Sequence, residues 1–262
     1  MNAFFRTNGY DEVFSQENYP ADKVVNSFGV QDDFLYDYAI PVLNQRAATG
    51  QPFFATLLSI SNHPPYVIPP FFHPKTSEPE TQIVEYADWA LRQFFEEARK
   101  QPWFDNTIFV LEGDHGKLVG DAECELPESY NHIPLMIYSS RIQPEEKTTF
   151  GGQVDIQPTI LGLLNIDYLQ NNFGVDLLKE ERPCMFYTAD NMVVGRNDTL
   201  LYLYNYETQQ ELTYDIGNGK LNAVPMDDSF LPLKEYSFSM LQSAEFLVKH
   251  GKTLNSIPFT QQ

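Results

Sequence analysis

The sequence predicts an α/β fold with a mostly parallel central sheet flanked by helices, followed by a small C-terminal antiparallel sheet and helix. Two short apolar runs without polar alternation, at 53–60 and 107–111, are typical of buried strands in parallel sheets. Between them, residues 81–100 carry apolar side chains at helical spacing, as expected for a helix that crosses from one strand to the next. Beyond residue 184 the pattern changes to alternating segments that favour an antiparallel hairpin.

The composition is that of a globular protein. With 262 residues, of which 42% are hydrophobic and 20% charged, the chain is long enough for one sizeable domain or a domain with a small appendage. We predict an α/β domain part at 1–180 and a small α+β part at 181–262. No run reaches the roughly 20 apolar residues of a transmembrane helix, and the first residues lack the pattern of a signal peptide. Any targeting element is therefore expected to lie outside this sequence.

Charge and cysteine content exclude several classes. The 36 acidic residues outnumber the 17 lysines and arginines, and the net charge of -19 is expected to repel nucleic acid. Cys124 and Cys184 lie far apart and outside any C-x-x-C pattern, so the sequence indicates neither a disulfide scaffold nor a cysteine metal site. One disulfide between the two cysteines is left open.

For the first half of the chain, the sequence predicts two helices with one strand between them. The first thirty residues are rich in turns, and we expect them to end an element that begins upstream. A helix is predicted through about Ala48, with Asp32 or Asp33 as its cap. A proline-rich surface loop follows the strand at 53–60. The buried face of the helix at 81–100 is predicted to consist of Val84, Ala87, Leu91, Phe94, Phe95 and Ala98.

The second half begins with the strand at 107–111. Asp155 is predicted to cap a helix that has Pro158 in its first turn, where a missing N–H costs little. The other predicted elements are an acidic loop, a strand, a hairpin and a terminal helix, at 120–131, 133–138, 199–204 with 211–215, and 233–250.

The strand at 107–111 runs into Gly113-Asp114-His115-Gly116. Ligands of open α/β sheets bind beyond the carboxyl ends of the strands, and aspartate and histidine are common metal ligands. The two glycines are expected to give the backbone conformations closed to other residues and so bring the carboxylate and the imidazole toward one point. Asp114 and His115 are therefore candidate metal ligands, although Asp114 could instead be a turn or capping carboxylate.

A second strand end carries a histidine. The run at 53–60 is followed by Ser61, Asn62 and His63 and then by two prolines. His63 is a candidate substrate-binding residue that Asn62 would orient; alternatively, both residues simply form the turn.

Two further residues keep alternative interpretations. His132 precedes the strand at 133–138 and could be a third metal ligand, although a histidine at a strand start lies at the opposite end from the site. Lys117 could meet a phosphate as a point charge or be a solvated lysine after a glycine.

Four motifs occur in the order seen in the sulfatase-like branch of the alkaline phosphatase superfamily. The sequence most resembles lipoteichoic acid synthases and related phosphoglycerol transferases, over roughly Gly9 to Leu178. The motifs that carry the resemblance lie at Ser61–Pro65, Gly113–Gly116, His132–Tyr138 and Thr149–Thr159.

The resemblance implies an extracytoplasmic domain with a membrane anchor. In that family a threonine attacks a phosphodiester, and the phosphoglycerol group passes through a covalent intermediate to an acceptor hydroxyl. A divalent cation assists, usually manganese, with calcium, zinc and magnesium as alternatives. The substrate would be a phospholipid or polyol phosphate. By this resemblance Asp114 and His115 are metal ligands and His63 contacts the substrate.

The resemblance assigns no catalytic residue here. The family's threonine and its early acidic ligand align at or before Met1, as do an arginine and a tryptophan that contact the substrate. We expect the missing segment of the same domain to be the chain's partner, and the polypeptide alone to lack turnover and bind metal weakly.

Three functions remain open. The leading one is a metal-dependent phosphoglycerol-type transferase or phosphodiester hydrolase. The second is a sulfatase, and the third is a non-catalytic fragment or assembly module. The sequence leaves the donor, the acceptor and the oligomeric state undefined.

Overall fold

The structure is a computed structural model that describes residues 2–118, 120–170 and 172–253. The chain divides into two compact units, one made of Met1–Val110 and Met136–Ile142, the other of Leu111–Leu135 and Gln143–Gln262. The predicted division into an α/β domain part at 1–180 and a small α+β part at 181–262 stays a prediction.

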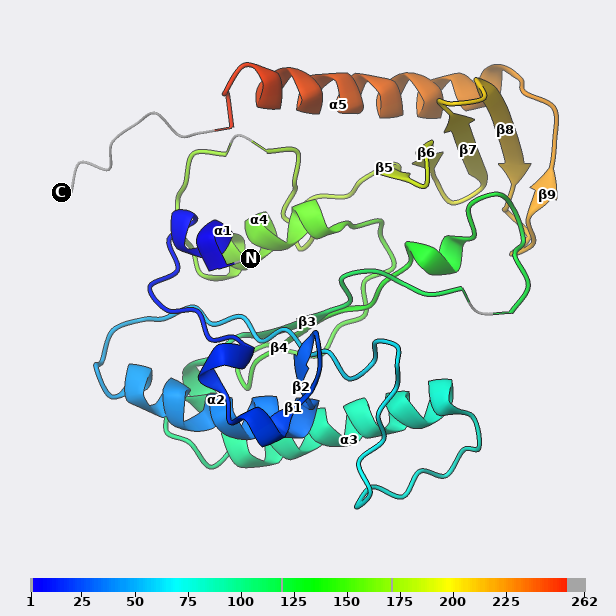
Figure 1. Ribbon diagram of the computed structural model, residues 1–262. Coiled ribbons are helices and arrows are strands. Elements are labelled where there is room, and N and C mark those ends of the chain that lie inside the picture. The colour runs from blue at the N-terminus through cyan, green and yellow to red at the C-terminus, as the bar shows by residue number, and fades with distance from the viewer. Residues whose placement is uncertain (1, 119, 171, 254–262) are drawn as a thin grey trace. The chain divides into compact units, whose positions relative to one another are not determined.

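The first unit is built on two long helices. Helices α2 (Asp32–Ala47) and α3 (Pro79–Ala98) lie side by side (Figure 1). Both helices were predicted, and both are confirmed to within two residues at each end. The smaller elements of this unit are α1 (Asn2–Thr7), β1 (Val24–Asn26) and β2 (Gly29–Val30). The buried apolar residues of its core are Ala39, Leu43, Phe94, Ala98, Trp103 and Phe104.

The buried face of α3 agrees with the prediction at Phe94 and Ala98 but not at Val84. Val84 was expected inside but is 52% exposed. The predicted and the observed sets both recur at helical spacing, so the partner helix, rather than the period, decides which stripe is covered. The buried residues of α3 are Ile83, Tyr86, Ala90, Phe94 and Ala98.

The predicted cap of α2 is wrong. The residue at the N-cap is Gln31, and it makes no side-chain capping bond. Asp33 instead accepts hydrogen bonds from the amide of Phe34 and the hydroxyl of Tyr86, at 2.8 and 2.6 Å. Asp32 accepts from a different segment, the turn after residue 59.

The predicted strand at 53–60 is also wrong, because these residues form no strand. A strand exists only with a hydrogen-bonded neighbour, and no strand in the described ranges pairs with this segment. Several of its apolar side chains are exposed, with Phe54 79% and Leu58 54% exposed, whereas Leu57 packs against the core of the first unit.

The other two central strands are confirmed. β3 (Phe109–Glu112) and β4 (Leu135–Tyr138) pair as a two-stranded sheet, and the chain passes from one unit to the other within each of them. A mostly parallel central sheet stays a prediction.

The second unit contains a five-stranded antiparallel sheet in which each strand pairs with its neighbour along the chain. The predicted hairpin is β7–β8, and the predicted terminal helix is α5 (Leu231–Lys249), which packs against β5 and β6 (Figure 1). The strands are β5 (Met185–Ala189), β6 (Met192–Arg196), β7 (Leu200–Asn205), β8 (Gln210–Asp215) and β9 (Asn222–Ala223).

Side chains of β7 alternate between two hydrophobic clusters. Leu201 and Leu203 pack with Leu126 of the acidic loop, whereas Tyr202 packs with Leu233 of α5. Successive strand residues point to opposite faces, so one short strand serves both clusters.

The two cysteines belong to different clusters. Cys124 packs against the cluster of Leu201, and Cys184 belongs to that of Tyr202. Both are free thiols, so the disulfide left open by the sequence is not formed.

No helix within the described ranges combines the length and apolar character that crossing a membrane requires.

Helix α5 lies close to the sheet at Gly195. A Cβ there would lie 2.6 Å from Ser237 Oγ and 2.9 Å from the Leu233 carbonyl oxygen. We expect Gly195→Ala to lower the free energy of unfolding by about 1–3 kcal/mol, because the helix must move outward. Urea unfolding measures this loss. Gly217→Ala is the matched control, since its Cβ would meet nothing closer than 3.4 Å; equal stability of the two variants would contradict the packing argument.

Candidate functional site

Asp114 and His115 form an exposed turn directly after β3. His115 Nε2 and Asp114 Oδ2 lie 3.9 Å apart, and the two side chains are 72% and 76% exposed. The turn therefore brings an imidazole nitrogen and a carboxylate oxygen together, as predicted from the motif, and both remain accessible to a ligand.

The turn orients both side chains through its own backbone. His115 Nδ1 lies 2.7 Å from the Gly116 carbonyl oxygen. Because a carbonyl only accepts, Nδ1 donates in this contact, and the lone pair of Nε2 is left for a metal. Asp114 Oδ1 accepts from the His115 amide at 3.0 Å, so its other oxygen faces the imidazole.

The two glycines act differently from what we predicted. Neither Gly113 nor Gly116 has a positive φ, so neither needs a backbone conformation closed to other residues. Gly116 instead permits a close approach: its amide donates to the Tyr130 carbonyl at 2.8 Å, and a Cβ would lie 1.9 Å from the Ser129 carbonyl oxygen.

A glutamine that was not among the predicted site residues donates hydrogen bonds to this turn from another element. Gln153 lies in the short 3-10 helix η5 (Gln153–Asp155), and its Nε2 donates to the carbonyl oxygens of Gly113 and Asp114, at 3.2 and 2.9 Å. The only sequence signal was its place in the motif at 149–159, which we had interpreted as the approach to a helix.

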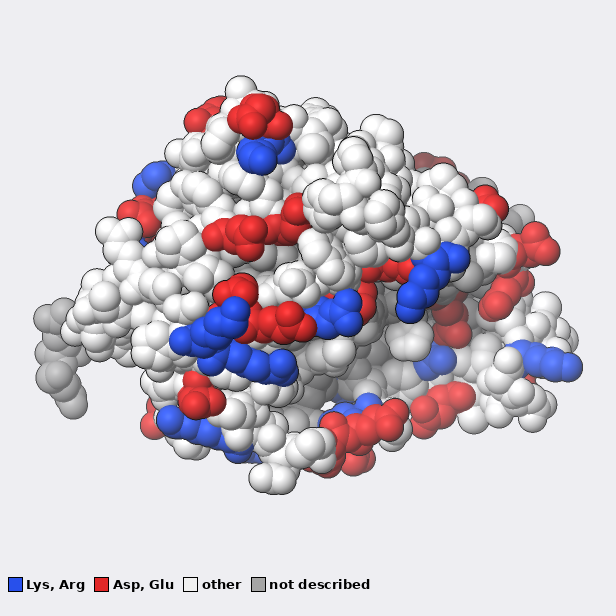
Figure 2. Space-filling view, turned by 90° about the horizontal axis from the view of Figure 1, so that it is seen from below, with Lys and Arg blue, Asp and Glu red and all other residues white. Residues whose placement is uncertain are grey.

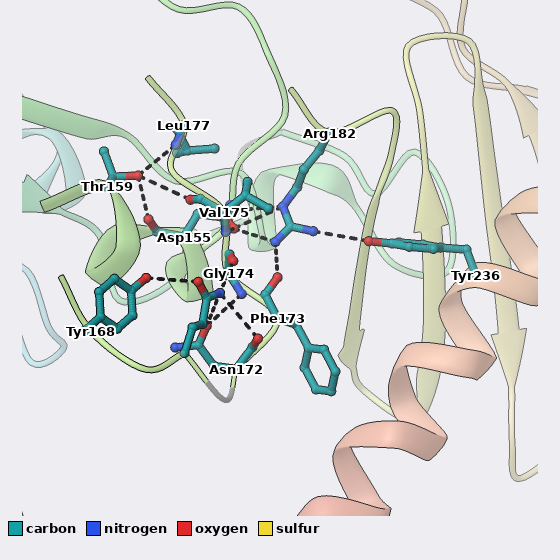
Figure 3. A network of polar contacts seen from close by, with 12 residues as sticks. Asp155, Thr159, Tyr168, Asn172, Phe173, Gly174, Val175, Leu177, Arg182 and Tyr236 are labelled. Carbon is teal, nitrogen blue, oxygen red and sulfur yellow. Dashed lines mark hydrogen bonds and ion pairs between the residues drawn. The ribbon is translucent and has the colours of Figure 1, made fainter. Parts of the chain in front are cut away.

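Asp155 does more than occupy the capping position assigned to it. It precedes α4 (Ile156–Leu163), as predicted, but its side chain makes no capping bond to that helix. The carboxylate is fully buried and bound by the guanidinium of Arg182, whose Nε lies 3.0 and 3.1 Å from its two oxygens (Figure 3).

Asn62 and His63 form a second exposed turn. His63 Nδ1 lies 2.7 Å from the Pro64 carbonyl oxygen, which leaves Nε2 free, and the ring packs on Phe28 with centroids 4.0 Å apart. These residues belong to the first unit and Asp114 and His115 to the second. That the four residues share one site stays a prediction.

A buried carboxylate fixes the turn that leads to His63. Asp32 Oδ1 accepts from the amides of Ile60 and Ser61, each at 3.0 Å. Ser61 Oγ in turn donates to Gln31 Oε1 at 2.7 Å. Burial raises the pKa of Asp32, and the hydrogen bonds from Ser61 and Ile60 partly offset this increase.

The residues described offer only part of a metal site. Asp114 and His115 fit a hard or borderline divalent cation as two ligands, one oxygen and one nitrogen. No group of three or more His, Cys, Asp or Glu within residues 2–118, 120–170 and 172–253 is arranged to hold a metal, so His132 does not complete the set. Burial raises the pKa of Glu112, and the negative charge of Asp114 raises it further.

Acidic and basic side chains are interspersed on the face that Figure 2 shows. The chain as a whole carries a net charge of -19. A field of this sign raises the local concentration of cations, which favours cation binding at an exposed carboxylate.

Residues 1–166 match the sulfatase family, which is more than half of the chain. The protein therefore belongs to the sulfatase family, and the membership implied by the four motifs is confirmed.

Among curated relatives the chain is similar to lipoteichoic acid synthase 1 of Bacillus subtilis (strain 168), with 27% identity over 234 residues. The match covers 81% of this chain and 35% of the relative, so the chain spans about a third of that protein.

Solved structures show the same fold. A protein in the alkaline phosphatase superfamily from Vibrio parahaemolyticus matches with a TM-score of 0.82 and 27% identity, over 95% of this chain and 62% of that one. The lipoteichoic acid synthase LtaP from Listeria monocytogenes has the same fold, with a TM-score of 0.77 and 21% identity over 97% of this chain and 67% of that one. The α/β architecture is thus alkaline phosphatase-like.

The packing at Gly116 gives a prediction about the turn. In Gly116→Ala the Cβ would meet backbone atoms of Ser129 and Tyr130, which cannot rotate away as a side chain can. We expect the free energy of unfolding to fall by about 1–3 kcal/mol and the thermal midpoint, measured by circular dichroism, to be lower. Gly113→Ala is the control, because its Cβ would lie 3.4 Å from Ile133. A Gly116→Ala protein that melts like wild type would show that the turn does not depend on this approach.

Asp32 gives a prediction about pH. The pKa of Asp32 in the folded state is raised above its value of about 3.9 in the unfolded state. Its contribution to the free energy of unfolding is therefore fully present below the unfolded-state pKa and is lost as the pH rises through the folded-state pKa. Asp32→Asn keeps an acceptor oxygen but does not titrate. Urea unfolding from pH 4 to 7 should therefore show the variant gaining stability relative to wild type as the pH rises. A relative stability that is constant or falls over this range would contradict the assignment.

Proposed function

We propose that this chain forms part of a divalent-metal-dependent transferase or hydrolase of phosphoglycerol-type esters. The observation that carries the proposal is the exposed Asp114–His115 pair, whose oxygen and nitrogen face one another 3.9 Å apart at the end of β3. Membership of the sulfatase family and the similarity to a lipoteichoic acid synthase support the choice of substrate class.

Asp114 Oδ2 and His115 Nε2 would hold the cation. When bound, the cation would offset charge on the phosphoryl oxygens and lower the pKa of an attacking hydroxyl. The Gly116 carbonyl accepts from His115 Nδ1, so in the neutral ring the lone pair for the metal lies on Nε2. Manganese is the leading candidate, with calcium, zinc and magnesium as alternatives, and two ligands alone predict weak affinity.

His63 would bind the phosphate group of the substrate. Its Nδ1 is held by the Pro64 carbonyl and its ring rests on Phe28, so Nε2 is presented to solvent in a fixed direction. A protonated His63 would donate from Nε2 to a phosphoryl oxygen. Asn62, which is exposed beside it, would add a neutral hydrogen-bonding group.

Activity, location and partners of the whole protein are part of the proposal. We assign no nucleophile to this chain, and we propose that the nucleophile and the remaining ligands come from a segment outside this sequence. The whole protein would act on the extracytoplasmic side of a membrane, on a phospholipid or polyol phosphate.

A second candidate is a sulfuric ester hydrolase, which the match to the sulfatase family favours. The residue at the nucleophile position discriminates between the two. The bound metal is a second test, because the sulfatase hypothesis calls for calcium and manganese is the leading candidate for the phosphoglycerol hypothesis.

Metal binding tests the site directly. We expect Mn²⁺ to raise the thermal midpoint of the chain, since a ligand that binds only the folded state stabilises it by about 2.7 kcal/mol at 100 times its Kd. Asp114→Ala and His115→Ala should abolish the shift. His73→Ala, which removes another exposed histidine, should keep it.

Three results would count against the proposal. A shift that survives both Asp114→Ala and His115→Ala would place the metal elsewhere. A shift with Ca²⁺ but not with Mn²⁺ would favour the sulfatase. No shift with Mn²⁺, Ca²⁺, Zn²⁺ or Mg²⁺, even with the upstream segment supplied, would favour a non-catalytic module.

A further inference from the structure

The Asp114–His115 turn is fixed by one amide nitrogen from another element. Gln153 Nε2 donates to the carbonyl oxygens of Gly113 and Asp114, at 3.2 and 2.9 Å. Both partners can only accept, so the nitrogen must donate to both, and the two hydrogens of a glutamine amide allow this. A carboxylate of the same shape could not replace it.

These two bonds set the direction in which the metal ligands leave the backbone. Two consecutive carbonyls that converge on one nitrogen fix the peptide groups on either side of Asp114. The His115 amide is then directed at Asp114 Oδ1, at 3.0 Å, and the imidazole leaves from the next Cα. Among the described residues, the other hydrogen bonds of this exposed turn are those within the turn and those from the Gly113 and Gly116 amides to the carbonyl oxygens of Pro134 and Tyr130.

Gln153 is exposed, but the helix that carries it is anchored in the interior. Asp155, two residues on, accepts from the Gly152 amide at 2.8 Å and so closes the turn of η5. Its second oxygen accepts from the Val175 amide at 2.8 Å. The buried carboxylate therefore ties the segment before α4 to the segment near residue 175.

Arg182 completes this anchor (Figure 3). Its guanidinium binds both oxygens of Asp155, donates to the Phe173 carbonyl and reaches the hydroxyl of Tyr236 on α5 at 3.2 Å. The two charges compensate each other in the interior, and removal of either residue would leave the other buried and unpaired.

We propose that Gln153 is a positioning residue for the metal ligands Asp114 and His115, and that the buried Asp155–Arg182 ion pair holds Gln153 in place. The inference rests on the proposed metal function of the pair. A merely structural Gln153 would affect the stability of the whole unit; a positioning Gln153 controls the order of residues 113–116 and their affinity for a cation.

Hydrogen–deuterium exchange of the 262-residue chain without metal tests the positioning by itself. In Gln153→Ala and Gln153→Glu we expect the amides of residues 113–116 to exchange about tenfold faster, with other segments unchanged. Gln153→Glu keeps the shape but cannot donate. The matched control is Gln157→Ala, which removes an amide bound to Asn172 one turn along the chain and should leave residues 113–116 unaffected.

Calorimetric titration with Mn²⁺ tests the consequence for the ligands. We expect the two Gln153 variants to bind Mn²⁺ about tenfold more weakly than wild type or Gln157→Ala. Arg182→Lys, which keeps the charge but not the two-point contact, should weaken binding in the same direction.

The possible results separate the two proposals. Unchanged exchange at residues 113–116 in both Gln153 variants, or faster exchange throughout the chain, would overturn the positioning role. Wild-type protein that binds no Mn²⁺ while residues 113–116 loosen in the variants would count against the proposed metal function and support the positioning. Wild-type Mn²⁺ binding that both Gln153 variants retain in full would overturn the positioning role alone.

Discussion

The second unit depends on one buried ion pair. Asp155 and Arg182 are 0% and 7% exposed, and such a pair is tolerated only if further hydrogen bonds satisfy the remaining atoms. Here those bonds come from backbone groups before α4, near residue 175 and at Phe173, and from a tyrosine of α5. One charged pair thereby connects four segments of the second unit through hydrogen bonds.

The first unit uses a related device without a cation. Asp32 is 2% exposed, and two amides of the turn before Asn62 satisfy its carboxylate. In each unit a buried carboxylate at a helix start therefore organises a loop, and that loop presents or supports an exposed residue suited to ligand binding. The exposed groups are chemically ordinary, and the two buried carboxylates bind the backbone of the segments that carry or support them.

The sequence predicted those parts of the fold that local pattern determines. Helices α2, α3 and α5 and the hairpin β7–β8 carry their periodicity within themselves, and Asp114 and His115 were recognisable because they end an apolar strand. The segment at 53–60 has the composition of a strand but pairs with no neighbouring strand. The composition of one segment does not determine whether a partner strand lies beside it. Asp155 is the N-cap residue of α4 as predicted, and Asp32 does not cap α2. The sequence revealed neither carboxylate's distant partners, which lie 27 residues from Asp155 and 28 from Asp32. The role of Gln153 could not be predicted, because its two acceptors are backbone oxygens, which every residue type has.

The position of the two thiols has a consequence for how the protein matures. Cys124 and Cys184 serve the two separate clusters to which alternate residues of β7 contribute, and neither is cross-linked. The second unit therefore reaches its packed state through non-covalent contacts alone. The formation of its two clusters therefore does not require oxidation of Cys124 or Cys184.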